Sequence, residues 1–340
     1  MRSLSKTRAL VRSLELDVLV FVEIGMGMCA YFLAFAAPTL AKKSMMFWGH
    51  GVTSGIRQGI DYFITSKKFH GNDHAVAQES FVEQLYLMES LTVSFQPPPL
   101  TSETTAIEFD LRRLVGVQSG EPHFYLAPTS LYKFHPLMDR AIIQLLHRDP
   151  QALIVLVKGN SKIWAHKICT RIHSKLLQKF GPEISQEMAR RLVVVPAMVR
   201  AVYLQFLRLG HVVMLPFPTT SSVTVFETIS VGTPFVSYGG SASYLLQHYA
   251  PGILLEAGVD SQCCIALTED DYVEKLLRLG TNTTYRDEVS RNILRGRDVL
   301  FHRDMKDKVV NEWEKMFHEV LSHTRYMYVK EEVHVRSVLL

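Results

Sequence analysis

Short apolar runs alternate with amphipathic stretches along most of the chain. The runs are rich in β-branched and other apolar residues, which is typical of strands buried on both faces, and they lie at residues 18–24, 43–48, 62–65, 123–127, 153–158, 191–195, 211–215 and 234–238. Helical stretches lie between them at residues 136–148, 163–180, 201–209 and 224–231. This alternation predicts an α/β fold, in which helices cover both faces of a parallel sheet.

One apolar stretch, residues 16–40, has the length of a membrane span. Asp17 and Glu23 lie inside it, two glycines interrupt it and Pro38 closes it. We therefore predict a buried strand followed by a short helix over residues 29–37, with a membrane anchor as the alternative. The basic start of the chain is separated from this stretch by polar residues, so a secretory signal is not expected.

The pattern divides the chain into two unequal α/β parts. The first part holds about three predicted strands, too few for a full α/β layer, so we expect it to be the end of a domain whose beginning is absent. The second has enough strands for a complete doubly wound, Rossmann-like domain, and a proline-rich polar segment separates the two. The expected units are a partial N-terminal domain 1–95, a linker 96–119, the Rossmann-like domain 120–305, an amphipathic helix 306–322 and a tail 323–340.

Composition narrows the possible functions. The 340 residues are 47% hydrophobic and 21% charged, which is ordinary for a globular protein, and the net charge of +4 is scattered, so nucleic acid is not an expected partner. The four cysteines form no CxxC pair, which indicates a reducing compartment, and the histidines form no HExxH pattern, so no metal is expected. A GxSxG elbow and a P-loop are also missing, which argues against a hydrolase or an NTPase.

The first candidate for chemistry is Lys133, between a predicted strand and a helix. Ligands of open parallel sheets bind beyond the carboxyl ends of the strands, where helix N-termini favour phosphate. A lysine at this position is placed to neutralise a diphosphate. From spacing alone, a solvated lysine is the alternative, and we favour it at this point.

The second candidate is the segment 215–236, in which a strand leads into a run of Thr and Ser and then a short helix carrying Glu227. The hydroxyl and N–H groups of residues 221–224 are suited to phosphate, and Glu227 is placed to accept both hydroxyls of a ribose. The alternative is that a Ser or Thr side chain caps the helix while Glu227 closes a capping box or is exposed. Spacing does not decide between them.

Several blocks of sequence follow one another in an order that is informative. The blocks are Glu23-Ile-Gly-Met, Tyr31-Phe-Leu-Ala-Phe-Ala, Trp48-Gly-His-Gly-Val-Thr-Ser-Gly-Ile, Ile60-Asp-Tyr-Phe-Ile-Thr-Ser, Thr129-Ser-Leu-Tyr-Lys-Phe-His-Pro and, after Glu227, Gly232-Thr-Pro. In this order and at these separations they resemble the catalytic region of protein O-GlcNAc transferases and the related SPINDLY-type enzymes, from about residue 15 to residue 320. The resemblance implies a GT-B fold in an intracellular protein of the cytoplasm or nucleus.

The resemblance also implies a reaction, namely inverting, metal-independent transfer of N-acetylglucosamine from UDP-GlcNAc to Ser or Thr hydroxyls of proteins. The donor is then a nucleotide sugar, the partner is a protein acceptor, and no cofactor is required. The family positions imply that His50 and Lys133 are catalytic. They further imply donor binding by Thr129, Ser130, Lys133, Arg200, Tyr203, Ser222, Val223, Thr224 and Glu227, and a cleft segment made of Gly49, Thr53, Ser54 and Gly55.

This sequence departs from the family in its phosphate loop and at its N-terminus. Relatives usually carry glycines in the loop, where this chain has Ser221-Ser222-Val223. The tetratricopeptide repeats and the first part of the family's N-terminal catalytic domain have no counterpart. Two alternatives therefore stay open: a catalytically inactive protein that binds nucleotide sugars or partners, and a protein O-fucosyltransferase that uses GDP-fucose.

Overall fold

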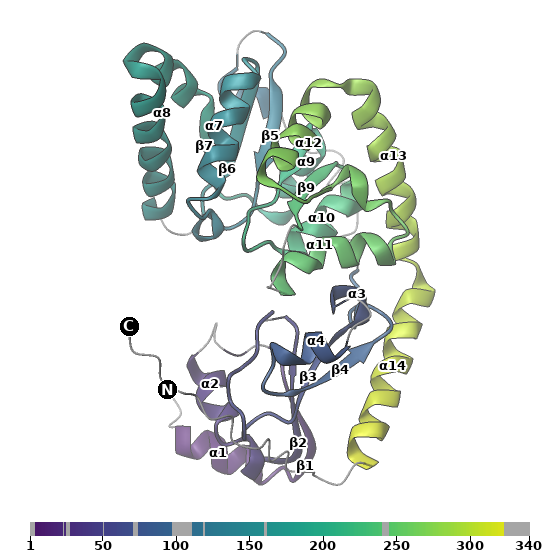
Figure 1. Ribbon diagram of the computed structural model, residues 1–340. Helices are drawn as coiled ribbons and strands as arrows, with labels where there is room; N and C mark the ends of the chain where they lie inside the picture. Colours follow the sequence, from purple (N-terminus) through teal and green to yellow (C-terminus); the bar gives the residue numbers. More distant parts are fainter. Residues whose placement is uncertain are drawn as a thin grey trace.

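Two parallel sheets, each flanked by helices, organise the chain in its computed structural model (Figure 1). The structure describes residues 4–22, 24, 28–49, 51–70, 74–96, 111–117, 120–159, 162–239 and 245–322. All of the strand pairs in these residues are parallel. The predicted α/β class with parallel sheets is confirmed.

The N-terminal sheet has the strand order β1-β2-β3-β4. Its strands are β1 (Leu16–Phe21), β2 (Ala41–Phe47), β3 (Tyr62–Ser66) and β4 (Gln84–Met88), and its helices are α1 (Leu4–Arg12), α2 (Met28–Ala34), η1 (Ala37–Thr39), α3 (Lys67–His70) and α4 (His74–Glu79). The expectation of three strands was wrong, because β4 is a fourth. Its five residues form a short run between charged Glu83 and Glu89, too short to stand out from the sequence around them.

The apolar stretch 16–40 divides as predicted. Its first half forms β1, and α2 lies in its second half. The β1 strand pairs with β2 from Leu16 to Phe21 and forms the edge of the N-terminal sheet. Within the part of the chain that the structure describes, no helix has the length and apolar character needed to cross a membrane.

The C-terminal sheet has the strand order β10-β9-β8-β5-β6-β7. Its strands are β5 (His123–Ala127), β6 (Ala152–Val157), β7 (Leu192–Val195), β8 (Val212–Met214), β9 (Phe235–Tyr238) and β10 (Ile265–Ala266). The helices around it are α6 (Leu111–Leu114), η2 (Leu131–Lys133), α7 (Met138–Arg148), α8 (Lys162–Arg190), α9 (Arg200–Leu209), α10 (Ser222–Val231), α11 (Leu245–Glu256), η3 (Ser261–Cys263), α12 (Glu269–Thr281) and α13 (Thr283–Leu300). This is the complete doubly wound domain that the sequence predicts.

The strand order reverses between β5 and β8. From β5 the chain moves outward to β6 and β7, whereas from β8 it moves the other way to β9 and β10. The segments that leave these two neighbouring strands therefore separate at the carboxyl edge of the sheet. Such a switch point is where open α/β sheets bind their ligands.

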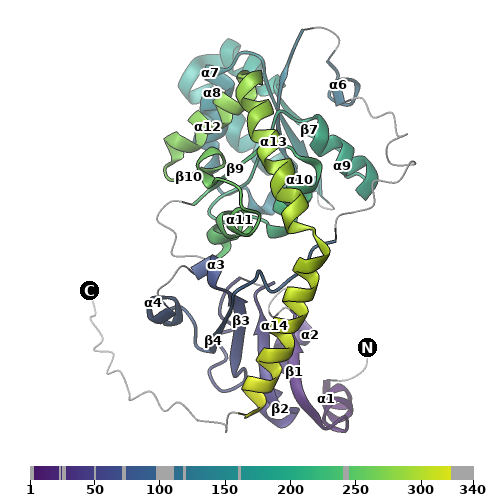
Figure 2. The same cartoon turned by 90° about the vertical axis from the view of Figure 1, so that its right-hand side faces the viewer.

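The last helix, α14 (Arg303–Ser322), crosses from the C-terminal domain to the N-terminal sheet (Figures 1 and 2). Its buried Met316 and Val320 pack with Met45, Tyr62 and Ile64 of β2 and β3. The Nε1 of Trp313 on the same helix donates to the carbonyl of Thr92 at 2.9 Å. The amphipathic pattern of this helix is thus explained by burial against the opposite domain.

The two domains also meet through α3 and α11. Trp48, Phe69 and Tyr249 form an aromatic cluster across this contact, with ring centroids 4.8 to 5.1 Å apart. The Tyr249 hydroxyl donates to the carbonyl of Trp48 at 2.7 Å. Buried Glu256 on α11 pairs with Lys68 at 2.9 Å. Because α3 directly follows β3, the carboxyl edge of the N-terminal sheet faces the C-terminal domain.

Candidate functional site

Lys133 lies at the switch point, and it contacts the loop that follows β8. Its Nζ donates to the backbone carbonyl of Thr220 at 3.0 Å, and its own N–H donates to the carbonyl of Ser130 at 3.0 Å. Burial lowers the pKa of the Lys133 side chain, which is half-buried rather than solvated as the alternative held. The structure thus brings together the two segments singled out from the sequence. An ammonium group in this environment is poised to pair with an anion.

The start of α10 presents an open helix N-terminus to the same place. Ser221 is the N-cap residue, but its side chain accepts no hydrogen bond from the helix backbone. The Thr224 hydroxyl donates to the Ser221 hydroxyl at 3.2 Å, while Val223 points outward and is exposed. Because the first N–H groups of a helix have no partner inside it, residues 222–224 offer donors and a positive dipole end to a phosphate.

Glu227 lies one turn further along α10 and is buried. Neither alternative for this residue holds, because it is not exposed and no capping box forms at this helix. Arg200 Nη2 lies 3.7 Å from its Oε1, and the Tyr203 hydroxyl is close enough to act on the pKa of its carboxyl. Burial raises the pKa of Glu227, an effect that Arg200 and Tyr203 partly offset. Arg200 and Tyr203 of α9 therefore lie beside Glu227 of α10.

Two buried hydroxyls lie in the segments that Lys133 joins, without partners of their own. Within the residues that the structure describes, the Oγ1 atoms of Thr129 and Thr220 are buried and make no hydrogen bond. Buried polar atoms are nearly always satisfied, so unpaired ones mark places where a water or a ligand completes the structure. Thr129 was among the expected residues, whereas Thr220 was missed; its position in the hydroxyl-rich loop was the available signal. Ser130 is exposed and contributes its carbonyl to Lys133.

The N-terminal domain holds the remaining candidates in the loop after β2. Thr53 Oγ1 and Ser54 N each donate to the Glu83 carboxylate at 2.7 Å, and Ser54 Oγ donates to it as well. Gly55 adopts a φ of +70°, a conformation that favours glycine. Gly49 is exposed directly after buried Trp48, and His50 lies outside the described residues. No sequence signal marked Glu83, because the strand that follows it was not recognised.

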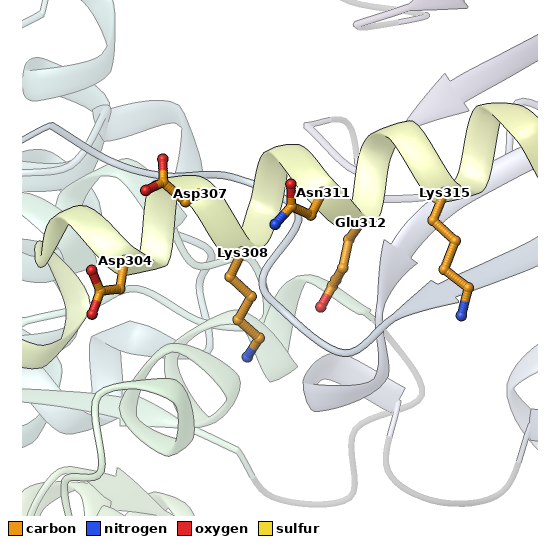
Figure 3. Close-up of a pocket in the computed structure, with 6 residues that line it drawn as sticks. All are labelled: Asp304, Asp307, Lys308, Asn311, Glu312 and Lys315. Carbon is orange, nitrogen blue, oxygen red and sulfur yellow. The ribbon is translucent and has the colours of Figure 1, made fainter.

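A groove of about 520 Å³ lies elsewhere, along α14. Its lining residues all come from that helix, and Lys308, Glu312 and Lys315 point to one side of it (Figure 3). Glu312 there accepts hydrogen bonds from the backbone and hydroxyl of Ser90. Among the described residues, no three His, Cys, Asp or Glu side chains gather as metal ligands do. The polar groups suited to a ligand lie at the switch point of the C-terminal sheet, around Lys133 and the start of α10.

No protein-family model and no curated protein matches this chain. Solved structures match it in fold. An O-GlcNAc transferase mutant of Thermobaculum terrenum is 17% identical with a TM-score of 0.74; the match covers 94% of this chain and 55% of that one.

A UDP-forming trehalose-phosphate synthase of Burkholderia vietnamiensis is 11% identical with a TM-score of 0.56, over 94% of this chain and 78% of that one. A trehalose-6-phosphate protein of E. coli bound with UDP-2-fluoro glucose is 13% identical with a TM-score of 0.54, over 94% and 78% of the two chains. The expected GT-B fold is confirmed. The chain spans 55% of the length of the O-GlcNAc transferase chain.

Proposed function

We propose that this chain binds a nucleotide sugar and transfers N-acetylglucosamine from UDP-GlcNAc to Ser or Thr hydroxyls of proteins. The observation that carries the proposal is the contact of Lys133 with Thr220 beside the open N-terminus of α10. This combination supplies a half-buried cation and free N–H donors at the switch point of a doubly wound sheet. The higher TM-score of the O-GlcNAc transferase, 0.74 against 0.56 for a trehalose-phosphate synthase, supports this reaction over transfer to a sugar phosphate.

The proposed role of these groups is electrostatic. As the bond to the sugar breaks, negative charge grows on the leaving diphosphate, and preorganised donors stabilise that charge. Lys133 and the N–H groups of residues 222–224 are placed for this role. The buried carboxylate of Glu227, which lies beside Arg200, is suited to accept hydrogen bonds from the ribose hydroxyls. The proposed reaction requires no cofactor.

A second candidate is a protein that binds nucleotide sugars without transferring them. The observation that favours it is the loop itself: exposed Val223 stands at the helix start, and the Thr220 carbonyl already accepts from Lys133. A branched side chain at this position narrows the approach of a phosphate to the backbone. The other alternative is a GDP-fucose donor. The binding measurements described next distinguish it from UDP-GlcNAc.

Calorimetric titration of the full chain with UDP, UDP-GlcNAc, GDP and GDP-fucose tests the proposal. We expect UDP and UDP-GlcNAc to bind, and Lys133→Ala to weaken both by at least about tenfold, because a charge-assisted contact with phosphate is lost. The matched control is Lys167→Ala on α8, an exposed lysine that we expect to leave binding unchanged. If the folded wild-type protein binds none of these nucleotides, the donor site does not exist.

Transfer is measured separately with radiolabelled UDP-GlcNAc and a mixture of denatured proteins as acceptor. Label on Ser or Thr that disappears in Lys133→Ala supports the enzyme. Tight binding of UDP-GlcNAc without any transfer supports the non-transferring protein instead. Preference for guanine nucleotides would assign the site to GDP-fucose.

A further inference from the structure

Arg171 on α8 joins the segment that carries Lys133 to the first turn of α7. Its Nη2 donates to the backbone carbonyl of Phe134, the residue after Lys133, at 3.0 Å. The same guanidinium donates from Nε and Nη2 to the two carboxylate oxygens of Asp139, at 2.8 Å each. A planar guanidinium can serve both partners because its donors point in fixed directions. One side chain thus fixes η2 relative to α7.

The Lys133 segment has little stability of its own. The helix η2 is a single turn of three residues, and such a short helix depends on its surroundings. Phe134 leaves the turn with a φ of −77° and a ψ of 80°, and it is 3% exposed. A buried carbonyl at this point needs a donor from elsewhere in the chain, and Arg171 provides it. Because Lys133 directly precedes this carbonyl, the direction of its side chain depends on that bond.

The carboxylate of Asp139 holds the Arg171 side chain in place. Asp139 is fully buried, and a buried carboxylate needs charged partners. Lys175, one turn after Arg171 on α8, also donates to it at 2.8 Å. Both cations therefore neutralise Asp139. In the part of the chain that the structure describes, only Arg171 also bonds to the Phe134 carbonyl.

We propose that Arg171 is a positioning residue, which holds residues 131–134 so that the Lys133 ammonium stays at the switch point and meets the diphosphate of the donor. This inference rests on the proposed function. With Arg171 in place, that ammonium lies 3.0 Å from the Thr220 carbonyl, beside the start of α10. The Arg171 guanidinium is itself engaged by Asp139 and Phe134, so it acts on the ligand through Lys133.

The test compares the affinities of wild type and Arg171→Met for UDP, by calorimetry, and for uridine, by NMR titration. We expect the affinity for UDP to fall by about fivefold, because Lys133 is held less firmly against the diphosphate. The affinity for uridine, which has no phosphate, is expected to stay within about twofold. Lys175→Met is the matched control. It removes an equal charge from the same carboxylate but leaves the bond to Phe134, so both affinities are expected to stay within about twofold.

A second measurement combines Arg171→Met with Lys133→Ala. If Arg171 acts through Lys133, its removal from Lys133→Ala lowers the affinity for UDP no further, so the two losses are not additive. A merely structural role would lower the affinities for UDP and uridine together, or would add to the loss in Lys133→Ala. Either outcome overturns the inference.

If Arg171→Met does not fold, Arg171→Lys takes its place. It keeps a cation beside Asp139, but an ammonium lacks the fork that reaches both partners, so we expect it to act in the same direction. Wild-type protein that binds UDP no more tightly than these variants overturns this inference and leaves the proposed function standing. Wild-type protein that does not bind UDP overturns both.

Discussion

At the residue scale, burial removes two charged groups of the candidate site from water, and their polar partners only partly replace the lost hydration. Burial lowers the pKa of Lys133, whose ammonium donates to a neutral carbonyl. Burial also raises the pKa of Glu227, although Arg200 and Tyr203 act in the opposite direction. Groups held in their less favourable environment are typical of binding sites, because the ligand supplies the missing partner. Keeping these groups buried therefore destabilises the protein that has no ligand bound.

The variant Glu227→Gln measures how much the buried charge of Glu227 destabilises the fold. At neutral pH we expect the variant to unfold at the same temperature as the wild type or higher, because it removes a buried charge. We also expect it to weaken binding of UDP by about tenfold, since an amide accepts fewer hydrogen bonds from a ribose than a carboxylate does. Thermal unfolding and calorimetry measure the two effects on one preparation.

The difference in stability between Glu227→Gln and the wild type depends on pH because the pKa of Glu227 is raised in the folded protein. The unfolded carboxyl titrates near 4.5 and the folded one above it, so the folded state is disfavoured once the pH exceeds both values. The stability advantage of Glu227→Gln is therefore largest above the folded pKa and vanishes as the pH falls through 4.5. The exposed Glu288→Gln is the control. A variant that is less stable than the wild type at neutral pH would show that the carboxylate stabilises the fold.

At the scale of the element, the end of α10 limits how this helix can be placed. Gly232 closes it with a φ of +78° and a ψ of 13°. A Cβ there would lie 2.5 Å from Leu294 Cδ2 of α13, so the glycine also permits close packing of the two helices. Ser290 of α13 donates to the Gly232 carbonyl at 2.6 Å. The helix that carries Glu227 is thereby anchored at its far end.

Gly232→Ala is expected to lower the free energy of unfolding by roughly 2 to 3 kcal/mol, combining the strain of a positive φ with the clash against α13. Gly258→Ala is the matched control. Gly258 has a φ of +66° and open space around its missing Cβ, so only the backbone strain of about 1 kcal/mol applies. Urea unfolding of both variants separates the two contributions. Equal losses would mean that Leu294 moves aside at no cost.

At the scale of the whole molecule, the contact between the domains depends on a close approach of α11 to α3. A Cβ at Gly252 would lie 2.8 Å from the backbone oxygen of Lys68 and 2.5 Å from the Phe69 ring. The ion pairs of Glu256 with Lys68 and Lys308 lie beside this contact. Backbone atoms cannot move aside as a flexible side chain can, so the glycine is needed here for packing.

Gly252→Ala gives a prediction whose sign depends on tertiary structure. In an isolated helix this change is favourable by about 1 kcal/mol. Here we expect a net loss of about 1 to 2 kcal/mol and a wider separation of the domains, because overpacking outweighs helix propensity. Urea unfolding and small-angle scattering report the two effects. Increased stability with unchanged scattering would show that the interface accommodates a methyl group.

The elements of this protein were predictable to different degrees for identifiable reasons. Strands such as β6 and β8 stand out because parallel strands buried on both faces are continuously apolar. The strand β4 was missed because its run is short and follows charged Glu83 directly. The helix α14 was recognised by its apolar spacing, but that spacing does not say which surface it covers.

Taken alone, the sequence determined the parallel α/β architecture, the Lys133 segment and the loop before α10, since local hydrophobic periodicity and turn residues act over a few neighbouring positions. Only the tertiary structure decided that these two segments meet, because their contact arises from the reversal of strand order between β5 and β8. It likewise decided that Glu227 is buried and that Glu83 holds the Thr53–Gly55 turn. Those environments are created by residues distant in the chain, and the free energy of a charge depends on what surrounds it.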